Sequence, residues 1–141
     1  EDVYITSAVR SRPYSIKHTF SKKENKEVIK YPNRKPTKKE IMAHAPFLDY
    51  EINCVKPKII VTVGTTALTR LLDDKYEISN VHGKIIENTP ILELNDKKDG
   101  YIWSKEKYIV VPQYHPAAVF YNRKLTEIIA QDWLNVKLLI K

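Results

Sequence analysis

Short apolar runs alternate along the chain with segments of helical periodicity. The run Val3–Val9 is rich in β-branched and aromatic residues and predicts a buried strand. Lys58–Val63 and Tyr108–Pro112 predict two further strands, and the few polar positions in Lys58–Val63 are typical of a strand covered on both faces. Gly64–Thr66 turns directly into a helix through Leu72. This order of strands and helices predicts an α/β fold with parallel strands and right-handed crossovers.

Two longer segments carry apolar residues at helical spacing. In the first, Thr37 and Glu40 form a capping box, Pro46 is expected to kink the helix and Pro57 to end it. Its apolar positions are Ile41, Ala45, Leu48, Ile52 and Val55. The second is a final helix from about residue 125 to 139, with Leu125, Ile128, Ile129, Trp133, Val136 and Leu139 on one face. Both helices are expected to flank the sheet.

The segments between these elements are mostly polar. Ser15–Lys35 is basic and has no clear period, which predicts a long loop with room for a short hairpin between Phe20 and Tyr31. The turn Asn95–Gly100 predicts a hairpin whose strands are Ile91–Leu94 and Tyr101–Trp103. The chain has no internal repeat and no change in composition that marks a boundary. Residues 1–141 are therefore predicted to form a single domain.

Composition narrows the classes of function. Apolar residues make up 43% and charged residues 29%, as expected for a folded domain. The net charge of +7 suits a polyanionic partner, although many basic proteins bind nothing anionic. No apolar run is long enough to span a membrane, and the chain begins without a signal-peptide pattern. Cys54, the single cysteine, excludes an internal disulfide and a cysteine-based metal site, so we expect a cytoplasmic protein.

Two turns after predicted strands are candidates for a ligand site. His115 follows the strand Tyr108–Pro112 and precedes Pro116, at the sheet edge where ligands of open parallel sheets bind. The alternative is a histidine that only caps a loop. Gly64 and Thr65 begin a helix whose free N–H groups attract an anion, although a plain turn from strand to helix explains them equally well.

Two further segments suit contact with nucleic acid. One is the basic stretch that contains Arg10, Arg12, Lys17, Lys22, Lys23, Lys26, Lys30, Arg34, Lys35, Lys38 and Lys39, interleaved with Tyr14, Phe20 and Tyr31. It is equally well explained as a solvated loop. The other is Val119–Tyr121, where an exposed apolar pair beside the ligand turn suits a wedge into a base stack. Its alternative is core packing ahead of the last helix.

Taken in order, these segments resemble the bacterial and archaeal family 4 uracil-DNA glycosylases. The family pattern runs DVYITN, then CRPP--NR-PT--E, then PK-iv-lG--A---LL, then rGk, then TyHPaalLR. The matching residues here are Asp2–Ser7, Arg12–Pro13, Asn33–Thr37, Pro46–Leu48, Lys56–Gly64, Ala67, Leu71–Leu72, Gly83–Lys84 and Tyr114–Ala118. No single piece is specific, but the ordered set covers most of the chain.

The resemblance implies a fold and an activity. It implies an α/β three-layer sandwich with a short central parallel sheet flanked by helices, here without the family's N-terminal strand. Such enzymes extrude uracil from DNA and cleave its N-glycosidic bond. By resemblance, His115 donates a hydrogen bond to the uracil O2 as negative charge develops, and Ser7 lies in the base pocket. The implied DNA-binding residues are Arg12, Asn33, Arg34, Gly64, Thr65, Lys84, Pro116, Ala117, Ala118, Val119, Phe120 and Arg123.

The chain departs from the family at four points. The Gly-Glu-Ala-Pro-Gly segment, which supplies the water-activating acid, has no match, so the family's N-terminal motif is expected to be missing or to lie upstream. Ser7 replaces an asparagine and cannot match the paired donor and acceptor of an amide. Ser11 and His44 fall at two cysteine positions of the family's [4Fe–4S] cluster, so neither a cluster nor another cofactor or metal is expected. Tyr121 stands where the family has an arginine, and Arg123, two residues further on, is expected to take the place of that arginine.

Three hypotheses about function follow. The first is a monomeric DNA repair glycosylase acting on uracil or a related damaged base in single- or double-stranded DNA. The second is a member of the superfamily that has lost excision and serves as a nucleic-acid-binding or interaction module, which Ser7 and the replaced cysteines favour. The third is a small-molecule hydrolase, for which the sequence offers no nucleophile or metal set.

Overall fold

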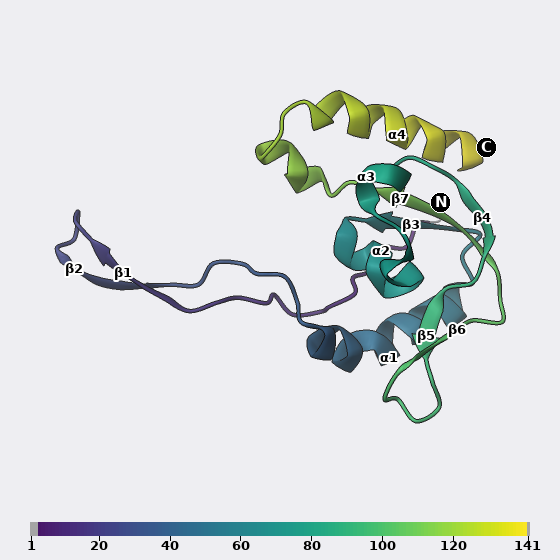
Figure 1. The fold of residues 1–141 in the computed structure, drawn as a ribbon, viewed down its shortest axis with the longest axis horizontal. Helices are drawn as coiled ribbons and strands as arrows, with labels where there is room; N and C mark the ends of the chain where they lie inside the picture. Colours follow the sequence, from purple (N-terminus) through teal and green to yellow (C-terminus); the bar gives the residue numbers. More distant parts are fainter. Residues whose placement is uncertain (1–2, 141) are drawn as a thin grey trace.

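A three-stranded sheet forms the centre of the protein in the computed structural model, which describes residues 3–140 (Figure 1). β3 (Ile59–Val63) lies parallel to β7 (Tyr108–Gln113), which confirms two predicted strands and their direction. β4 (Ile86–Thr89) pairs antiparallel with the other edge of β7. The expectation of an all-parallel sheet is therefore wrong, and the sheet is mixed. A parallel neighbour needs a long crossover, usually a helix, whereas the chain between β4 and β7 forms a hairpin.

That hairpin joins β5 (Leu92–Leu94) and β6 (Tyr101–Trp103), as the sequence predicts. A second hairpin joins β1 (Lys17–Ser21) and β2 (Lys26–Lys30). It lies in the stretch that was expected to be a long loop with room for a short hairpin between Phe20 and Tyr31, and it begins earlier, at Lys17. The hairpin extends far from the body of the protein (Figure 1). We refer to residues 12–35 as the arm.

The helices begin and end close to the predicted positions. α1 (Lys38–Val55) starts at the Thr37–Glu40 capping box, continues through Pro46, and ends at Lys56 in the left-handed conformation. The remaining helical segments are α2 (Thr65–Leu72), the 3-10 helix η1 (Asp73–Lys75), α3 (Ile78–Val81), the 3-10 helix η2 (Pro116–Phe120) and α4 (Leu125–Ile140). None of the helices between residues 3 and 140 has the length and apolar character needed to cross a membrane.

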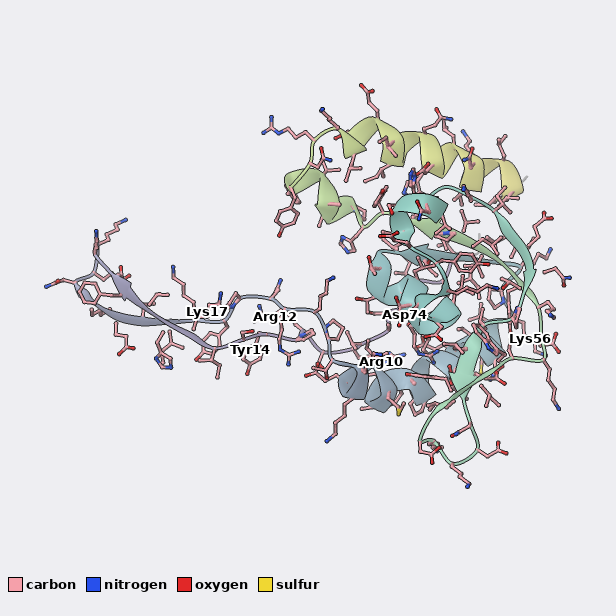
Figure 2. The ribbon with its side chains drawn as sticks, in the orientation of Figure 1. Arg10, Arg12, Tyr14, Lys17, Lys56 and Asp74 are labelled. Atoms are coloured by element: carbon pink, nitrogen blue, oxygen red, sulfur yellow. The ribbon has the colours of Figure 1, made fainter. Side chains whose placement is uncertain are left out.

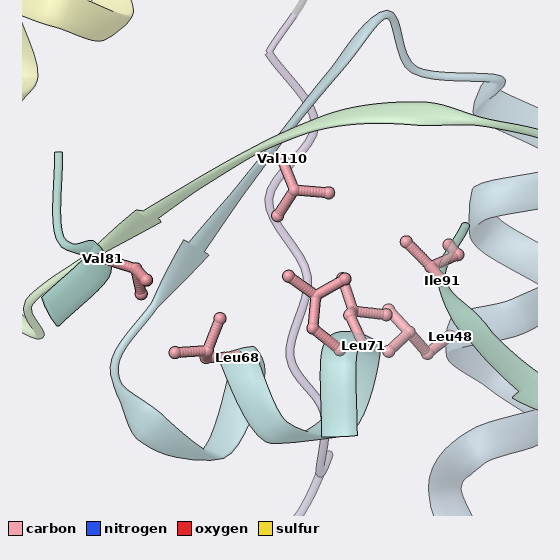
Figure 3. Close-up of a cluster of buried hydrophobic side chains, with 7 residues drawn as sticks. Leu48, Leu68, Leu71, Val81, Ile91 and Val110 are labelled. Atoms are coloured by element: carbon pink, nitrogen blue, oxygen red, sulfur yellow. The ribbon is translucent and has the colours of Figure 1, made fainter. Parts of the chain in front are cut away.

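The core lies between the sheet, α2 and α1 (Figure 3). Leu68 and Leu71 of α2 meet Val110 of the central strand, and Leu48 of α1 and Ile91 close the cluster. These buried side chains fix α2 against the sheet. The turn that opens α2 is therefore held in place at the carboxyl end of β3.

A buried ion pair ties α2 to α1. The side chain of Arg70 donates to Asp49 at 2.5 Å and to the carbonyl oxygen of Leu92 at 2.8 Å. Asp49 also accepts from the backbone N–H of Leu94 at 2.8 Å, and the Arg70 guanidinium lies over the ring of Tyr101. Two helices and the β5–β6 hairpin thus meet at one charged pair.

The N-terminal segment does not form the buried strand that its composition predicts. Val3 and Ile5 are 79% and 88% exposed, and residues 3–9 make no sheet pairing. β-branched residues favour extended backbone, but a strand also needs a neighbour with free hydrogen-bonding groups. Here the segment is attached to α1 instead, through contacts of Thr6 and Arg10 with Glu51.

The predicted apolar face of α4 is only partly buried. Val136 is buried as expected, but Ile128 and Trp133 stay substantially exposed, and Asp132 occupies the other buried position. Asp132 has polar partners beneath the helix, which offset the cost of burying a carboxylate.

Candidate functional site

His115 and Gly64 lie side by side at the carboxyl edge of the sheet. Because β3 and β7 are parallel, the residues that follow them emerge at the same edge, and the Gly64 N–H donates to the carbonyl oxygen of Gln113 at 2.8 Å. Gly64 has a φ of +87°, which a residue with a side chain rarely adopts. A Cβ on Gly64 would lie 3.2 Å from the Cβ of His115. Glycine therefore gives both the turn and the room that His115 occupies.

One nitrogen of His115 is committed to the backbone. Its Nδ1 accepts a hydrogen bond from the N–H of Ala117 at 3.1 Å, and the residue is the N-cap of η2. In a neutral ring the proton is therefore on Nε2. Nε2 makes no hydrogen bond within residues 3–140, and the side chain is exposed. The capping role and the functional role are compatible, because each uses a different nitrogen.

The start of α2 lies beside this ring. Gly64 is the N-cap, and no side chain caps the helix there. Its first N–H groups and the positive end of its dipole favour a group that carries or gains negative charge. With the His115 Nε2–H, the edge can stabilise a developing anion.

A polar cluster supports the His115 turn from beneath. Asp132 of α4 lies 2.7 Å from Nδ1 of His82, whose ring packs 4.7 Å from that of Tyr114. Gln113 donates to the carbonyl oxygen of Asp132, and Gly83 donates to that of Pro112 at 2.8 Å. The sequence reading missed this cluster. The one available signal was an aspartate within the apolar face of α4.

The η2 turn carries five of the twelve predicted DNA-binding residues to this edge. Pro116 to Phe120 form η2, directly after His115. Phe120 is 89% exposed and Tyr121 is 92% exposed, so the alternative of core packing is wrong for both. Lys84 and Arg123 are also exposed. Lys84 is held near the end of β7, because the preceding residue, Gly83, donates a hydrogen bond to the carbonyl oxygen of Pro112.

Three other predicted residues hold the base of the arm. The Arg12 guanidinium donates to the side-chain oxygen of Asn33 at 2.7 Å. Arg34 forms a two-pronged pair with Glu40 at 2.9 and 2.7 Å and donates to the carbonyl oxygen of Tyr14. The guanidinium of Arg34, with the Thr37 N–H, lowers the pKa of Glu40 to about 2. The DNA-binding role of these residues stays a prediction, as does the base-pocket role of Ser7, which is exposed.

The residues at the family's cluster positions do not fit an iron–sulfur cluster. Ser11 is exposed, and the Nδ1 of His44 accepts from the Arg10 N–H at 3.0 Å. Neither position offers the thiolate that such clusters require. Cys54 is exposed on α1, about 15 Å along the helix from His44 at 1.5 Å per residue. No group of three or more potential metal ligands occurs within the described part of the chain.

Comparisons with known proteins agree with the ordered motifs. A family model described as the Uracil DNA glycosylase superfamily matches residues 1–137. A type-4 uracil-DNA glycosylase of Sulfurisphaera tokodaii is 33% identical over 140 residues, which cover 97% of this chain and 50% of the relative. Relatives of the same name from Saccharolobus solfataricus and Thermotoga maritima are each 32% identical, over 97% and 100% of this chain and 51% and 58% of their own lengths. The chain thus spans about half the length of the curated relatives it matches.

Proposed function

This chain belongs to the uracil DNA glycosylase superfamily, and from that premise we propose that its protein hydrolyses the N-glycosidic bond of uracil, or a related damaged base, extruded from DNA. The observation that carries the proposal is the hydrogen bond from the Ala117 N–H to the His115 Nδ1. That bond orients the ring and leaves the Nε2–H to donate to the base.

The chemistry of base release explains why such a donor matters. A base within a duplex cannot be reached, so it is first turned out of the stack. Breaking the N-glycosidic bond then leaves an oxocarbenium-like sugar and a uracil anion. The His115 Nε2–H donates to the O2 oxygen of that anion, and the first turn of α2 adds positive potential beside it. Both groups act more strongly on the charged leaving group than on the neutral base.

The exposed aromatic side chains of η2 serve the extrusion step. Phe120 and its neighbour Tyr121 are both almost fully exposed in the turn that follows His115. Inserted into the base stack, Phe120 fills the space that the extruded nucleotide leaves. Lys84 and Arg123 are assigned to phosphates that flank the extruded nucleotide, and Ser7 to the base pocket. No water-activating residue is assigned within residues 3–140.

The same proposal covers the wider setting of the protein. In this proposal the protein binds DNA, acts as a monomer and is located in the cytoplasm. The fold of the whole protein is a three-layer sandwich. Support for the last statement comes from α2, which packs against the sheet, and from the superfamily match.

A single-turnover excision assay on uracil-containing single- and double-stranded DNA tests this function in the full-length protein. We expect His115→Ala to lower the excision rate about 100- to 1000-fold, the range for removing one donor to a developing anion. Lys98→Ala, at an exposed residue of the loop between β5 and β6, is the control and should excise like the parent. A full-length protein that leaves uracil untouched overturns the excision proposal. Full excision by His115→Ala overturns the assignment of that residue.

A further inference from the structure

The arm concentrates the positive charge of the protein. Residues 12–35 contain eight lysines and arginines and only two glutamates, so they hold six of the seven net positive charges of the chain. Figure 2 shows Arg12, Tyr14 and Lys17 following one another outward from the body. The rest of the chain is therefore close to neutral, and the basic charge is carried on a projection.

The base of the arm is built firmly. Tyr14 and Asn33 form an antiparallel bridge, Ser15 donates to the carbonyl oxygen of Pro32, and Arg34 donates to that of Pro13. The ring edge of Tyr14 also packs on Tyr31, with centroids 5.4 Å apart. These contacts hold the two sides of the arm together at its base, and the Arg34–Glu40 pair joins that base to α1.

The β1–β2 hairpin carries Lys17, Lys26 and Lys30 on one face, and of these only Lys26 has an acidic partner within residues 3–140. Residues directly opposite in an antiparallel pair share a face. Lys17 is paired with Lys30, and Lys26 lies on the same face four pairs further out. Glu27 lies on the opposite face and pairs with His18, whereas Glu24 pairs with Lys26 beside the turn. Like charges directly opposite destabilise a hairpin, and a bound anion removes that cost.

The arm also lacks packing that would stabilise it alone. Phe20 is 65% exposed, and Ile29 on the same face is about half exposed. An isolated two-stranded hairpin is only marginally stable in water. Together with the charge, this indicates a segment that is stabilised by a partner outside the protein.

We propose that the lysine face of the arm is a second DNA contact, which binds the phosphate backbone of the duplex without regard to sequence at a distance from His115. The proposal rests on the proposed function for the identity of the polyanion. In Figure 1 the arm and the turn that follows β7 project toward the same side of the body, as contact of one duplex with both requires. The extended chain from Tyr14 to Ser21 spans about 25 Å at about 3.3 Å per residue, which corresponds to about seven base pairs.

The hairpin that carries this contact has no counterpart in the family pattern. There the Asn-Arg pair follows Cys-Arg-Pro-Pro after two residues, whereas here the whole hairpin lies between Arg12-Pro13 and Asn33-Arg34. The β1–β2 hairpin is therefore an addition relative to that pattern.

Binding of a uracil-free duplex tests the arm separately from excision. The arm variant changes Lys17, Lys22, Lys26 and Lys30 to Gln. The matched control changes Lys97, Lys98, Lys105 and Lys107 to Gln, which removes the same four charges from exposed loops beside β6. Affinity for a labelled duplex of about 30 base pairs is measured by anisotropy across a series of salt concentrations.

We expect the arm variant to bind at least about tenfold more weakly at low salt and to lower the slope of log affinity against log salt by about 3. The control should stay within about twofold of the parent. Equal losses in the arm variant and the control, or parental binding by the arm variant, overturn the proposal.

A second variant guards against local misfolding of the substituted hairpin. Residues 16–31 are replaced by Gly-Gly, which closes the arm at its base. This variant should lose DNA affinity like the arm variant and should unfold at the same denaturant midpoint as the parent protein. If it binds DNA as tightly as the parent, the proposal is overturned. Single-turnover excision at saturating protein separates the two proposals. If the arm variant loses DNA affinity but still excises uracil, the DNA-binding role of the arm is supported. If the parent protein binds DNA through the arm but does not excise uracil, only the proposed function is overturned.

Discussion

The carboxylate of Asp132 lies directly over Gly83, where a Cβ would approach its Oδ1 atom to 2.2 Å. Gly83 also has a φ of +69°. The absence of a side chain at residue 83 therefore lets α4 reach His82 and support the turn that carries His115. This contact links the C-terminal helix to the candidate site.

Gly83→Ala should be strongly destabilising. The left-handed backbone and the collision with Asp132 together should lower the free energy of unfolding by about 2–4 kcal/mol. Urea denaturation measures the change. Gly100→Ala is the matched control, because its Cβ would meet only Asn95, at 3.4 Å. A Gly83→Ala protein as stable as the control would contradict the packing described for α4.

Gly64→Ala should harm excision more than its effect on folding explains. The added Cβ would lie 3.2 Å from the Cβ of His115, at a backbone angle that disfavours alanine. We expect a loss of about 1–2 kcal/mol in stability and at least a tenfold slower single-turnover excision under conditions where the variant is fully folded. If excision stays at the parental rate, the close contact between Gly64 and His115 does not position the ring.

Arg70→Met should leave the carboxylate of Asp49 buried without its cationic partner. Breaking such a pair on one side costs about 3–5 kcal/mol, which denaturant unfolding resolves. Arg123→Met, at an exposed arginine, should change stability by less than about 0.5 kcal/mol. A double change of Arg70 and Asp49 to apolar residues should recover part of the loss, because no unpaired charge remains.

The pair between Glu40 and Arg34 should make stability fall in acid. The pKa of Glu40 is lowered from 4.5 to about 2 in the folded protein, chiefly by the Arg34 hydrogen bond. The stabilisation is therefore complete above pH 4.5 and is lost as the pH falls through about 2. Glu40→Gln keeps the capping box with Thr37 but removes this titration.

The measurement is the urea midpoint of the parent and of Glu40→Gln between pH 2 and 6. The two midpoints should converge as the pH falls, since other carboxylates titrate alike in both proteins. Thr37→Ala is the matched control: it loses the cap but keeps the ion pair, so its offset from the parent should stay nearly constant with pH. A constant offset for Glu40→Gln would contradict the lowered pKa.

Local patterns in the sequence determined much of the fold. The Thr37–Glu40 capping box set the start of α1 because the bonds that form it lie within one helical turn. The apolar runs of β3 and β7 set two neighbouring parallel strands, and the Asn95–Gly100 turn set the β5–β6 hairpin. The order of the motifs predicted His115 as a site residue, and the parallel pairing of β3 and β7 places it beside Gly64; its role stays a prediction.

Tertiary structure decided what depends on partners distant in sequence. Val3–Val9 has the composition of a strand, yet it stays exposed because no strand edge pairs with it. β4 runs antiparallel to β7 because the β5–β6 hairpin connects the two strands. The four residues of β4 do not by themselves determine that direction. The sequence shows Asp132 only as an acidic residue in an apolar helix face. The structure places it against His82 and Gly83, which are distant in the chain, and so explains why it is buried. Hydrogen-bond partners and burial are properties of the assembled chain, so local pattern leaves them open.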